Sequence, residues 1–430
     1  MSADIPEQLP SYKTVTEVFD WGAAVSKVII KWPEEIEGNT VNKDTFKVYA
    51  RRILPDCALS PSLAFKKKDV KINLGTTSKN DNDLQGYREV TDAFVSDENG
   101  NKKSKDCFIT IEMSVHPKNA LSSALNFDLN TFFNNFVQPN YTIIQNNSIN
   151  NKNNIVIDNY KGNIRPIVDK FNFSHKNIKF ISLGYASYEP SDDKIHPLII
   201  WLHGMGEGGS DNPSIPIMAN KANMFADESL QKYFEGAYVL VPQCPTFWMH
   251  GYKHFGDGTS IYENTLIELI KFYINKHSNI DKTRIYVGGD SNGGYMTMIL
   301  LRDYPEFFAA GFPTCEALRN DQITDSDIQN LAKTPIWFIS AKNDTTVIPK
   351  DHVIPTFERL QKIGANVHFS FFDDVHDTSG LYKKEDGKPY EYFGHWSWIY
   401  VYNDECEEVI DGKKVKLMEW LANQRKEIKK

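Results

Sequence analysis

The sequence predicts two domains of different fold class, a β-sandwich followed by an α/β domain whose mostly parallel sheet carries helices on both faces. In the N-terminal part, short segments of alternating apolar and polar residues are separated by turn residues, without helical periodicity. From about Lys179 onward, apolar runs alternate with helical segments, which is the pattern of repeated strand–helix units. The length of 430 residues is sufficient for two or three domains.

Composition argues against several classes of protein. Hydrophobic residues make up 41% and charged residues 24%, as in ordinary globular proteins. The formal net charge of −8 argues against nucleic acid as the main partner, since phosphate binding requires a basic face. No apolar run reaches the roughly 18 residues of a membrane span. The first ten residues lack the basic and apolar regions of a secretory signal, so we expect either a cytoplasmic protein or a trimmed mature form.

The first domain is predicted to comprise residues 1–133. Apolar alternation at 26–32, 45–53 and 107–115 predicts strands, and turn signals occur at 74–83 and 97–103. Strands at this spacing, with no helices between them, favour a β-sandwich. The next stretch, 134–163, holds 11 asparagines in 30 positions and has weak periodicity, so it is predicted to be a linker.

The second domain is predicted to comprise residues 164–430, and its apolar runs and periodic segments alternate along the chain. Strands are predicted at 197–204, 237–243, 284–289, 309–314, 335–341 and 367–372, and helices at 259–277, 291–304, 355–364 and 415–426. In a parallel sheet of this kind, functional residues gather at the carboxyl ends of the strands.

A serine lies at one of these strand ends. Gly289-Asp290-Ser291-Asn292-Gly293 fits the pattern G-x-S-x-G, with a predicted strand before it and a predicted helix after it. Such a turn is sharp and lifts the hydroxyl above the sheet, and glycines flank the serine because larger side chains would clash in the bend. The motif in this context predicts that Ser291 is a nucleophile.

A glycine-rich segment, HGMGEGG at 203–209, directly follows the apolar strand before it. Its backbone N–H groups would lie beside the serine, so we expect those of Met205 and Asn292 to stabilise an oxyanion. The alternatives are a tight turn or a phosphate loop. A Walker loop is excluded because no Lys-[ST] follows, and a dinucleotide loop would leave the serine turn unexplained.

Serine is a weak nucleophile, so a general base and an orienting acid are required. Asp344 follows the strand at 335–341 and is the predicted acid, whereas Asp351 begins the next helix and is interpreted as a cap. The base should follow the last strand, where His395 is favoured and His376 is the alternative. The order serine, aspartate, histidine is the chain order of α/β-hydrolases.

The region from about Phe180 to the C-terminus resembles the esterase branch of the prolyl-oligopeptidase-like α/β-hydrolases. The resemblance rests on LHGMGEGGSDN (202–212), VPQCP (241–245), RIYVGGDSNGGYMTM (284–298) and GHWSWIYVYND (394–404), the last of which supports His395 as the base. TVTEVFDWGAAVSKVIIKW (14–32) is similar to the immunoglobulin-like domain that precedes the hydrolase in some of these enzymes. The resemblance therefore implies an α/β-hydrolase fold after a smaller immunoglobulin-like β-sandwich, and a secreted protein.

Clues to the substrate are fewer. Trp248 and Trp396 are expected to line an apolar acyl or aryl pocket, with packing of loop aromatics as the alternative. Glu316 follows another strand and could contact a polar alcohol or an amine, while Glu207 is expected to shape its own loop. The cysteines have no CxxC spacing, which argues against structural zinc. In an oxidising compartment two bridges are conceivable, Cys57–Cys107 and Cys244–Cys315, and otherwise all are free thiols.

These features predict a serine carboxylesterase that needs neither metal nor cofactor. Its partner would be a small-molecule or carbohydrate ester, either a short-chain or an aryl ester, including acetylated or feruloylated plant polysaccharides. One alternative is a serine peptidase of the same fold, although the leading residues show no propeller repeat. The other is a carbohydrate-binding module with a degenerate hydrolase, which the complete set of serine, aspartate and histidine disfavours. The sequence indicates no oligomeric state.

Overall fold

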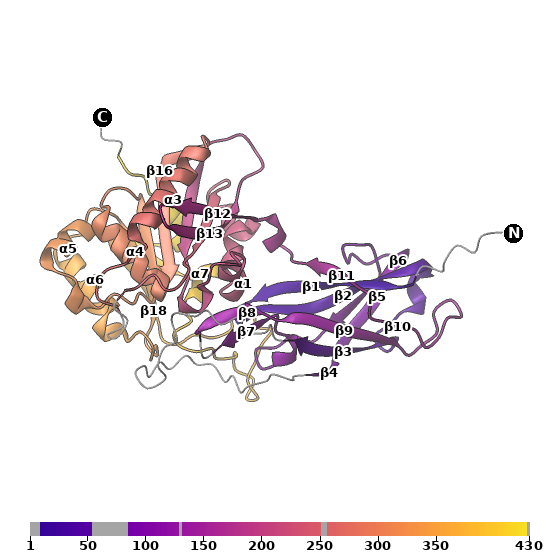
Figure 1. Ribbon diagram of the computed structural model, residues 1–430. Coiled ribbons are helices and arrows are strands. Elements are labelled where there is room, and N and C mark those ends of the chain that lie inside the picture. Colours follow the sequence, from indigo (N-terminus) through magenta and orange to yellow (C-terminus); the bar gives the residue numbers. More distant parts are fainter. Residues whose placement is uncertain (1–8, 54–84, 129–130, 251–255, 428–430) are drawn as a thin grey trace. The chain divides into compact units, whose positions relative to one another are not determined.

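The computed structural model describes residues 9–53, 85–128, 131–250 and 256–427 (Figure 1). The chain divides into two compact units. Of the described residues, the N-terminal unit comprises 9–53, 85–126 and 135–169, and the C-terminal unit comprises 127–128, 131–134, 170–250 and 256–427. The turn predicted at 74–83 and the thiol of Cys57 lie outside the described residues.

The N-terminal unit is built from two sheets. One has the order β11-β1-β2-β6-β5 and the other β10-β9-β3-β4. Their strands are β1 (Ser11–Phe19), β2 (Gly22–Glu37), β3 (Phe46–Ile53), β4 (Gln85–Arg88), β5 (Val90–Ser96), β6 (Lys105–Met113), β9 (Gln138–Gln145), β10 (Val156–Ile157) and β11 (Tyr160–Ile164). The strands predicted at 26–32, 45–53 and 107–115 correspond to β2, β3 and β6. Two further strands, β7 (Leu125–Asp128) and β8 (Phe133–Phe136), pair with each other.

The asparagine-rich stretch 134–163 differs from the linker that its composition predicts, because it contains β9, β10 and β11. Tyr141 and Ile143 alternate along β9 and are buried in the core of the sandwich. Several asparagines occupy the turns instead, and Asn150, Asn151 and Asn154 have positive φ angles. Asparagine tolerates this left-handed conformation better than most residues. The composition therefore reflects tight turns between strands.

A buried arginine joins strands of the sandwich. Arg88 is buried at the end of β4, and its guanidinium donates hydrogen bonds to the Tyr141 hydroxyl at 3.0 Å and to the carbonyls of Val25 and Ser114 at 3.0 and 2.9 Å. A guanidinium presents several donors in a fixed geometry, so one side chain can satisfy several buried acceptors. The bonds connect residues that are far apart in the sequence.

The C-terminal unit is built around an eight-stranded sheet of order β12-β13-β15-β14-β16-β17-β18-β19 (Figure 1). These strands are β12 (Asn172–Ile178), β13 (Ile181–Tyr188), β14 (His196–Leu202), β15 (Tyr238–Gln243), β16 (Ile280–Asp290), β17 (Ala310–Thr314), β18 (Ile336–Ala341) and β19 (Val367–Phe372), and a hairpin is formed by β20 (Glu407–Ile410) and β21 (Lys413–Lys416). Strands β14 to β19 run parallel, while β12 and β13 form an antiparallel hairpin at one edge.

The helices of this unit follow the strands in the predicted alternation. They are α1 (Ile215–Ala219), α2 (Glu228–Gln231), α3 (Glu263–Lys276), α4 (Asn292–Asp303), α5 (Asp325–Leu331), α6 (Val353–Lys362), α7 (Trp398–Tyr402) and α8 (Leu417–Asn423). The predicted helices at 259–277, 291–304, 355–364 and 415–426 correspond to α3, α4, α6 and α8. The edge hairpin and α7 were not predicted, because short elements give little periodic signal.

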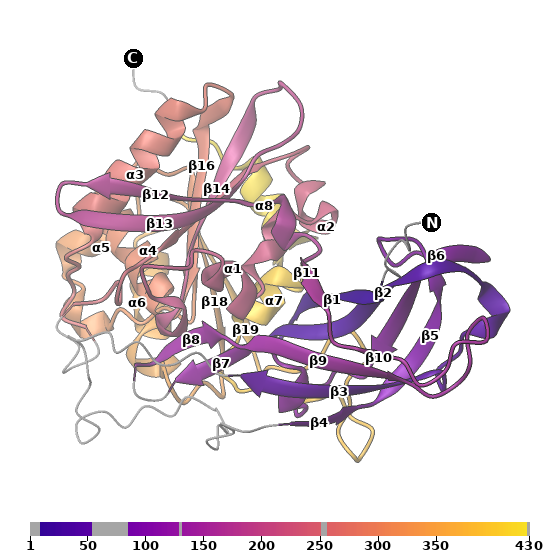
Figure 2. The same cartoon turned by 45° about the vertical axis from the view of Figure 1, so that its right-hand side comes forward.

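Strand β14 contributes to the core on both faces of the sheet. Leu198, Ile200 and Leu202 belong to the same core as the buried side chains of α3 and α4. Trp201 points to the opposite face, where its ring packs 5.2 Å from that of Phe225 and 5.3 Å from that of Tyr402 in α7. Figure 2 shows helices on both sides of the sheet, as the continuous apolar strands predict.

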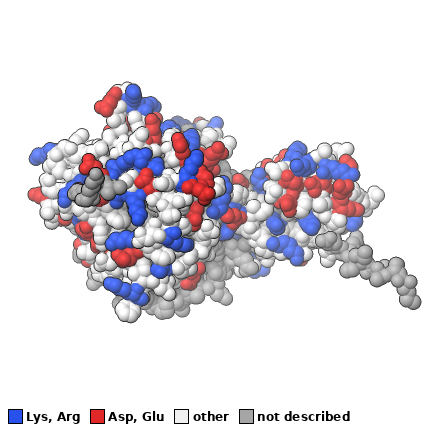
Figure 3. All heavy atoms as spheres, turned by 90° about the horizontal axis from the view of Figure 1, so that it is seen from above, with Lys and Arg blue, Asp and Glu red and all other residues white. Residues whose placement is uncertain are grey.

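The length and polarity of the helices and the mixed charges of the surface agree with the apolar and charged composition of the sequence. Among the described residues, no helix combines the length and the apolar character that crossing a membrane requires. On the face drawn in Figure 3, basic and acidic side chains of the described residues are interspersed.

We predict that Arg88→Ala destabilises the N-terminal unit by about 2–4 kcal/mol, because it leaves several buried acceptors without a donor. Urea denaturation followed by circular dichroism measures the change. Arg51→Ala, at an exposed position of the neighbouring strand β3, serves as the control and should change stability by less than about 0.5 kcal/mol. Equal effects of the two substitutions would contradict the role given to Arg88.

Candidate active site

Ser291 occupies a strained turn between the sheet and a helix. Strand β16 ends at Asp290 and α4 begins at Asn292, and the serine between them has φ 55° and ψ −112°. A positive φ is uncommon for a residue with a side chain and persists only where surrounding contacts hold it. The Ser291 N–H donates to the carbonyl of Thr314 at 2.9 Å, and the Ser291 carbonyl accepts from the N–H of Tyr295 at 2.8 Å. The side chain is half-buried at the carboxyl end of β16.

The two glycines of the motif are required by close packing against strand β14. A Cβ atom at Gly293 would lie 1.8 Å from the carbonyl oxygen of Leu202, and one at Gly289 would lie 2.5 Å from the same oxygen. Neither distance is compatible with a side chain. The G-x-S-x-G pattern therefore follows from how closely the turn approaches β14.

The structure brings together the three side chains that the sequence predicts as nucleophile, base and acid. His395 Nε2 lies 2.9 Å from Ser291 Oγ, and His395 Nδ1 lies 2.7 Å from Asp344 Oδ2. Asp344 is buried, and its other oxygen accepts hydrogen bonds from the N–H groups of Thr346 at 2.8 Å and Val347 at 2.9 Å. A carboxylate facing Nδ1 favours the tautomer that carries the proton there, which leaves Nε2 as an acceptor toward the serine.

The alternative candidates lie elsewhere. His376 Nδ1 contacts Asp374 Oδ1 at 2.5 Å, and its backbone N–H donates to the Tyr400 hydroxyl at 3.0 Å. Asp351 is the last residue of the short 3₁₀ helix Pro349–Asp351, just before α6. The geometry therefore distinguishes His395 from His376, which the sequence left open.

The predicted oxyanion donors lie at the starts of two helical turns. Met205 is the first residue of the 3₁₀ helix η4 (Met205–Glu207), and Asn292 is the first residue of α4. The first N–H groups of a helix have no partner within it and are available to a ligand. The Asn292 side chain has a separate role, because its Oδ1 accepts hydrogen bonds from the N–H groups of Trp248 at 2.8 Å and Met249 at 3.2 Å.

The structure places the three side chains suggested for substrate binding in different environments. Trp396 is half-buried and lies directly after His395, with its ring 6.3 Å from that of Trp398. Trp248 is fully buried, and its indole N–H donates to the His203 carbonyl at 3.2 Å, so it belongs to the core and not to a substrate surface. Glu316 is buried as well, and its Oε2 accepts from the N–H of Leu318 at 2.8 Å.

Burial raises the pKa of Glu316 well above its ordinary value. Burial thus opposes the negative charge, and the buried side chain presents no exposed carboxylate to an amine, contrary to the expectation. The sequence could not reveal the burial of Trp248 and Glu316, because both follow strands in the same way as the residues of the site.

His203 has a structural role that the sequence analysis missed. Its Nδ1 lies 2.6 Å from the Gly204 carbonyl, and its Nε2 accepts from the N–H of Cys244 at 2.9 Å. Burial lowers the pKa of His203 to about 4, so the ring is neutral and each nitrogen has a matching partner. The ring thereby connects the glycine-rich loop to the segment after β15. The sequence signal that could have revealed this role was the position of His203 directly before the glycine-rich loop.

The thiols are not bridged where they are described. Cys107, Cys244, Cys315 and Cys406 are free, so the suggested Cys244–Cys315 bridge does not form. The sulfur of Cys315 lies in a group with Asp344 and His395 whose ligand atoms are within 4.8 Å of one another. Thiolate, carboxylate and imidazole are all zinc ligands. However, the carboxylate and imidazole are already hydrogen-bonded to each other.

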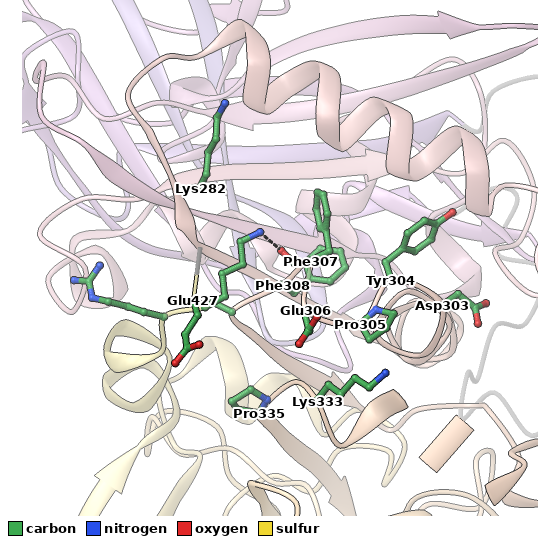
Figure 4. Close-up of a pocket in the computed structure, with 13 residues that line it drawn as sticks. Lys282, Asp303, Tyr304, Pro305, Glu306, Phe307, Phe308, Lys333, Pro335 and Glu427 are labelled. Carbon is green, nitrogen blue, oxygen red and sulfur yellow. Dashed lines mark hydrogen bonds between the residues drawn. The ribbon is translucent and has the colours of Figure 1, made fainter. Parts of the chain in front are cut away.

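A separate hollow of about 870 Å³ lies at the opposite ends of the strands (Figure 4). Its lining includes Lys282 near the start of β16, Ala309 just before β17 and Pro335 just before β18. The amine of Lys426 donates to the Phe307 carbonyl at 2.7 Å. Because Ser291 lies at the carboxyl end of β16, this hollow is not part of the site.

Comparison with known proteins finds similarities in both units. Residues 11–158 match the family "Esterase Ig-like N-terminal domain", and residues 258–319 match the "Prolyl oligopeptidase family". Acetylxylan esterase A of Emericella nidulans is 35% identical over 83 residues, which are 18% of this chain and 26% of that protein. The chain thus aligns with about a quarter of the length of this curated relative. A solved thermostable esterase superimposes with a TM-score of 0.74 at 22% identity, covering 97% of this chain and 100% of that one.

These findings define the class of the protein. Residues 11–158 are similar to the immunoglobulin-like domain found at the N-terminus of esterases, and the C-terminal unit has the fold of a solved esterase, with residues 258–319 similar to the prolyl oligopeptidase family. The resemblance and the fold class predicted from the sequence are confirmed.

We predict that Gly293→Ala destabilises the C-terminal unit by more than about 3 kcal/mol, because the added methyl group would overlap the backbone of β14. Thermal unfolding and near-ultraviolet circular dichroism measure the effect. Gly86→Ala provides a control, since its Cβ would lie at an ordinary 3.7 Å from the Leu121 side chain. A Gly293→Ala protein as stable as the unmodified one would contradict the packing argument.

Proposed function

We propose that the protein is a serine carboxylesterase with Ser291 as nucleophile, His395 as general base and Asp344 as the acid that orients the imidazole. The observation that carries this proposal is the continuous hydrogen-bonded series from Ser291 Oγ through His395 to Asp344. It lies at the carboxyl ends of parallel strands, where α/β proteins bind ligands.

In the acylation step, Ser291 Oγ attacks the carbonyl carbon of the ester while its proton passes to His395 Nε2. The negative charge that develops on the carbonyl oxygen is stabilised by the N–H groups of Met205 and Asn292. Collapse of the tetrahedral intermediate breaks the ester bond, and the departing alcohol takes the proton from His395. Asp344 stabilises the imidazolium while that proton is held.

In the deacylation step, water replaces the alcohol. His395 Nε2 removes a proton from the water as its oxygen attacks the acyl carbon, and the second tetrahedral intermediate uses the same N–H donors. Release of the carboxylic acid returns the proton to Ser291 Oγ. Every step uses side chains and backbone groups of this chain.

We propose a short-chain or aryl ester as the substrate, with acetyl or feruloyl groups on a plant polysaccharide as the natural example. Two observations support this choice: the half-buried Trp396 beside the base offers an apolar surface, and the relative from Emericella nidulans is an acetylxylan esterase. The match to the prolyl oligopeptidase family favours a peptidase as the second candidate. A panel of p-nitrophenyl esters, acetylated xylan, feruloylated arabinoxylan and peptide anilides tests both, and cleavage of the anilides alone would reject the esterase.

We predict that Ser291→Ala abolishes the hydrolysis of p-nitrophenyl acetate, because it removes the hydroxyl that contacts His395 and would form the acyl-enzyme. Steady-state rates and labelling by a fluorophosphonate probe measure the loss. Turnover equal to that of the unmodified protein would reject Ser291 as the nucleophile.

We predict that His395→Ala lowers kcat by about 10⁴-fold, as the loss of a base in a catalytic triad does. His376→Ala is the matched control and should stay within a few-fold of the unmodified protein, because this ring contacts Asp374. The pair is compared by kcat at saturating ester. A large loss in His376→Ala with little effect in His395→Ala would reverse the assignment.

A further inference from the structure

Two buried carboxyl groups lie between the oxyanion loop and the serine turn. Glu207 is the last residue of η4, whose first residue is Met205, and Asp290 is the last residue of β16, directly before Ser291. Their exposed fractions are 4% and 0%. Glu207 therefore lies in the same short helix as Met205, a proposed oxyanion donor, and Asp290 lies next to Ser291, the proposed nucleophile.

A single amide connects the two acids. Asn220 Nδ2 donates to Glu207 Oε2 at 3.1 Å and to Asp290 Oδ2 at 2.8 Å. The same two oxygens also surround Gly204, since a Cβ there would lie 3.0 Å from Glu207 Oε2 and 2.6 Å from Asp290 Oδ2. The two carboxyl groups thus face each other across one point of the oxyanion loop.

The two acids have unequal sets of donors. Glu207 Oε1 accepts from Asn134 Nδ2 at 3.1 Å, and this amide also donates to the Gly206 carbonyl at 3.1 Å. In contrast, Asp290 Oδ1 accepts no hydrogen bond within the described residues. The negative charge is therefore better stabilised on Glu207, and the proton is better held by Asp290.

Electrostatics requires that the pair retain a proton. Two adjacent carboxylates in a buried site cannot both be ionised at neutral pH. Burial raises the pKa of Glu207 to about 7 and that of Asp290 well above its ordinary value, and the negative charge of Glu207 further opposes ionisation of Asp290.

The other titratable groups near the pair are neutral. They are Tyr402 of α7 and Cys315 after β17, whose pKa values burial raises well above their ordinary ranges, and His203 after β14, whose pKa burial lowers. The indole of Trp201 also lies beside Asp290. None of these neighbours supplies a positive charge at neutral pH.

We propose that Glu207 and Asp290 share one proton, and that the resulting bond between them holds the oxyanion loop against the serine turn. Both are positioning residues, because they act through the backbone of Met205 and Ser291. The proposal rests on the function proposed above and adds a device that sets the geometry of its oxyanion donors.

Loss of the shared proton has a defined consequence. At alkaline pH two negative charges would face each other and push the loop away from the turn. Because an oxyanion donor acts only in the transition state, kcat should fall while KM changes little. The wild-type kcat should therefore decline on the alkaline side.

The main test compares the kcat–pH profiles of Glu207→Gln and Glu207→Ala on p-nitrophenyl acetate. The glutamine donates an N–H to Asp290 without needing a proton, so its kcat near pH 7 should stay within a few-fold and the alkaline decline should disappear. The alanine removes the bond, and kcat should fall by about 10²-fold at every pH. Glu228→Gln, at an exposed position of α2, is the matched control and should retain the wild-type profile.

Stability gives a readout that does not require activity. A carboxyl whose pKa is raised in the folded state stabilises the fold below its unfolded value of 4.5, and this contribution is lost as the pH rises through the folded value of about 7. Free energies of unfolding measured across that range should fall in the wild type and fall less in Glu207→Gln. The infrared difference spectrum between the wild type and Glu207→Gln at neutral pH should contain the band of a protonated carboxyl group, and the subtraction cancels any contribution from the buried Glu316, which both proteins share.

The outcomes separate the two proposals. If the wild type hydrolyses no ester, the proposed function fails, whereas the infrared band and the stability slope still test the shared proton. If Glu207→Gln loses as much kcat as Glu207→Ala at all pH values, or if Glu207→Ala keeps the wild-type kcat, the positioning proposal is overturned. An infrared difference spectrum without that band overturns the shared proton itself.

Discussion

The serine turn approaches strand β14 so closely that no side chain fits between them, and the rest of the site depends on this contact. The carbonyl oxygen of Leu202 occupies the space where Gly289 and Gly293 would carry a Cβ. The backbone at Ser291, between these glycines, has a positive φ. The same strand continues into the loop with Met205, so one contact positions both Ser291, the proposed nucleophile, and the segment that carries a proposed oxyanion donor.

Buried polar residues maintain this arrangement. His203 connects the glycine-rich loop to the segment after β15, and Asn220 reaches both Glu207 and Asp290. In a buried environment an unsatisfied polar group is costly, so a network with a matching partner at each contact has few alternative conformations. The geometry of the proposed site is thereby supported by residues that would touch no substrate.

The sequence could predict only in outline which distant residues come together in the site. Ser291 and His395 are separated by 104 positions, and Asp344 and His395 by 51. Their order and their places after predicted strands were sufficient to propose them, because the strand ends of a parallel sheet meet at one edge. They were not sufficient to choose between His395 and His376. The loop after β19 contains both histidines, and only its folded path decides which ring reaches the serine.

The sequence by itself determined the two fold classes, most strands and helices of the hydrolase domain, and the serine turn, because each depends on local periodicity or on a short motif. Only the tertiary structure decided that the asparagine-rich stretch contributes strands to the sandwich, that Trp248 and Glu316 are buried, and that Glu207 faces Asp290. Burial and the proximity of like charges depend on which segments pack together. These contacts join residues distant in the chain, and no local pattern of amino acids encodes them.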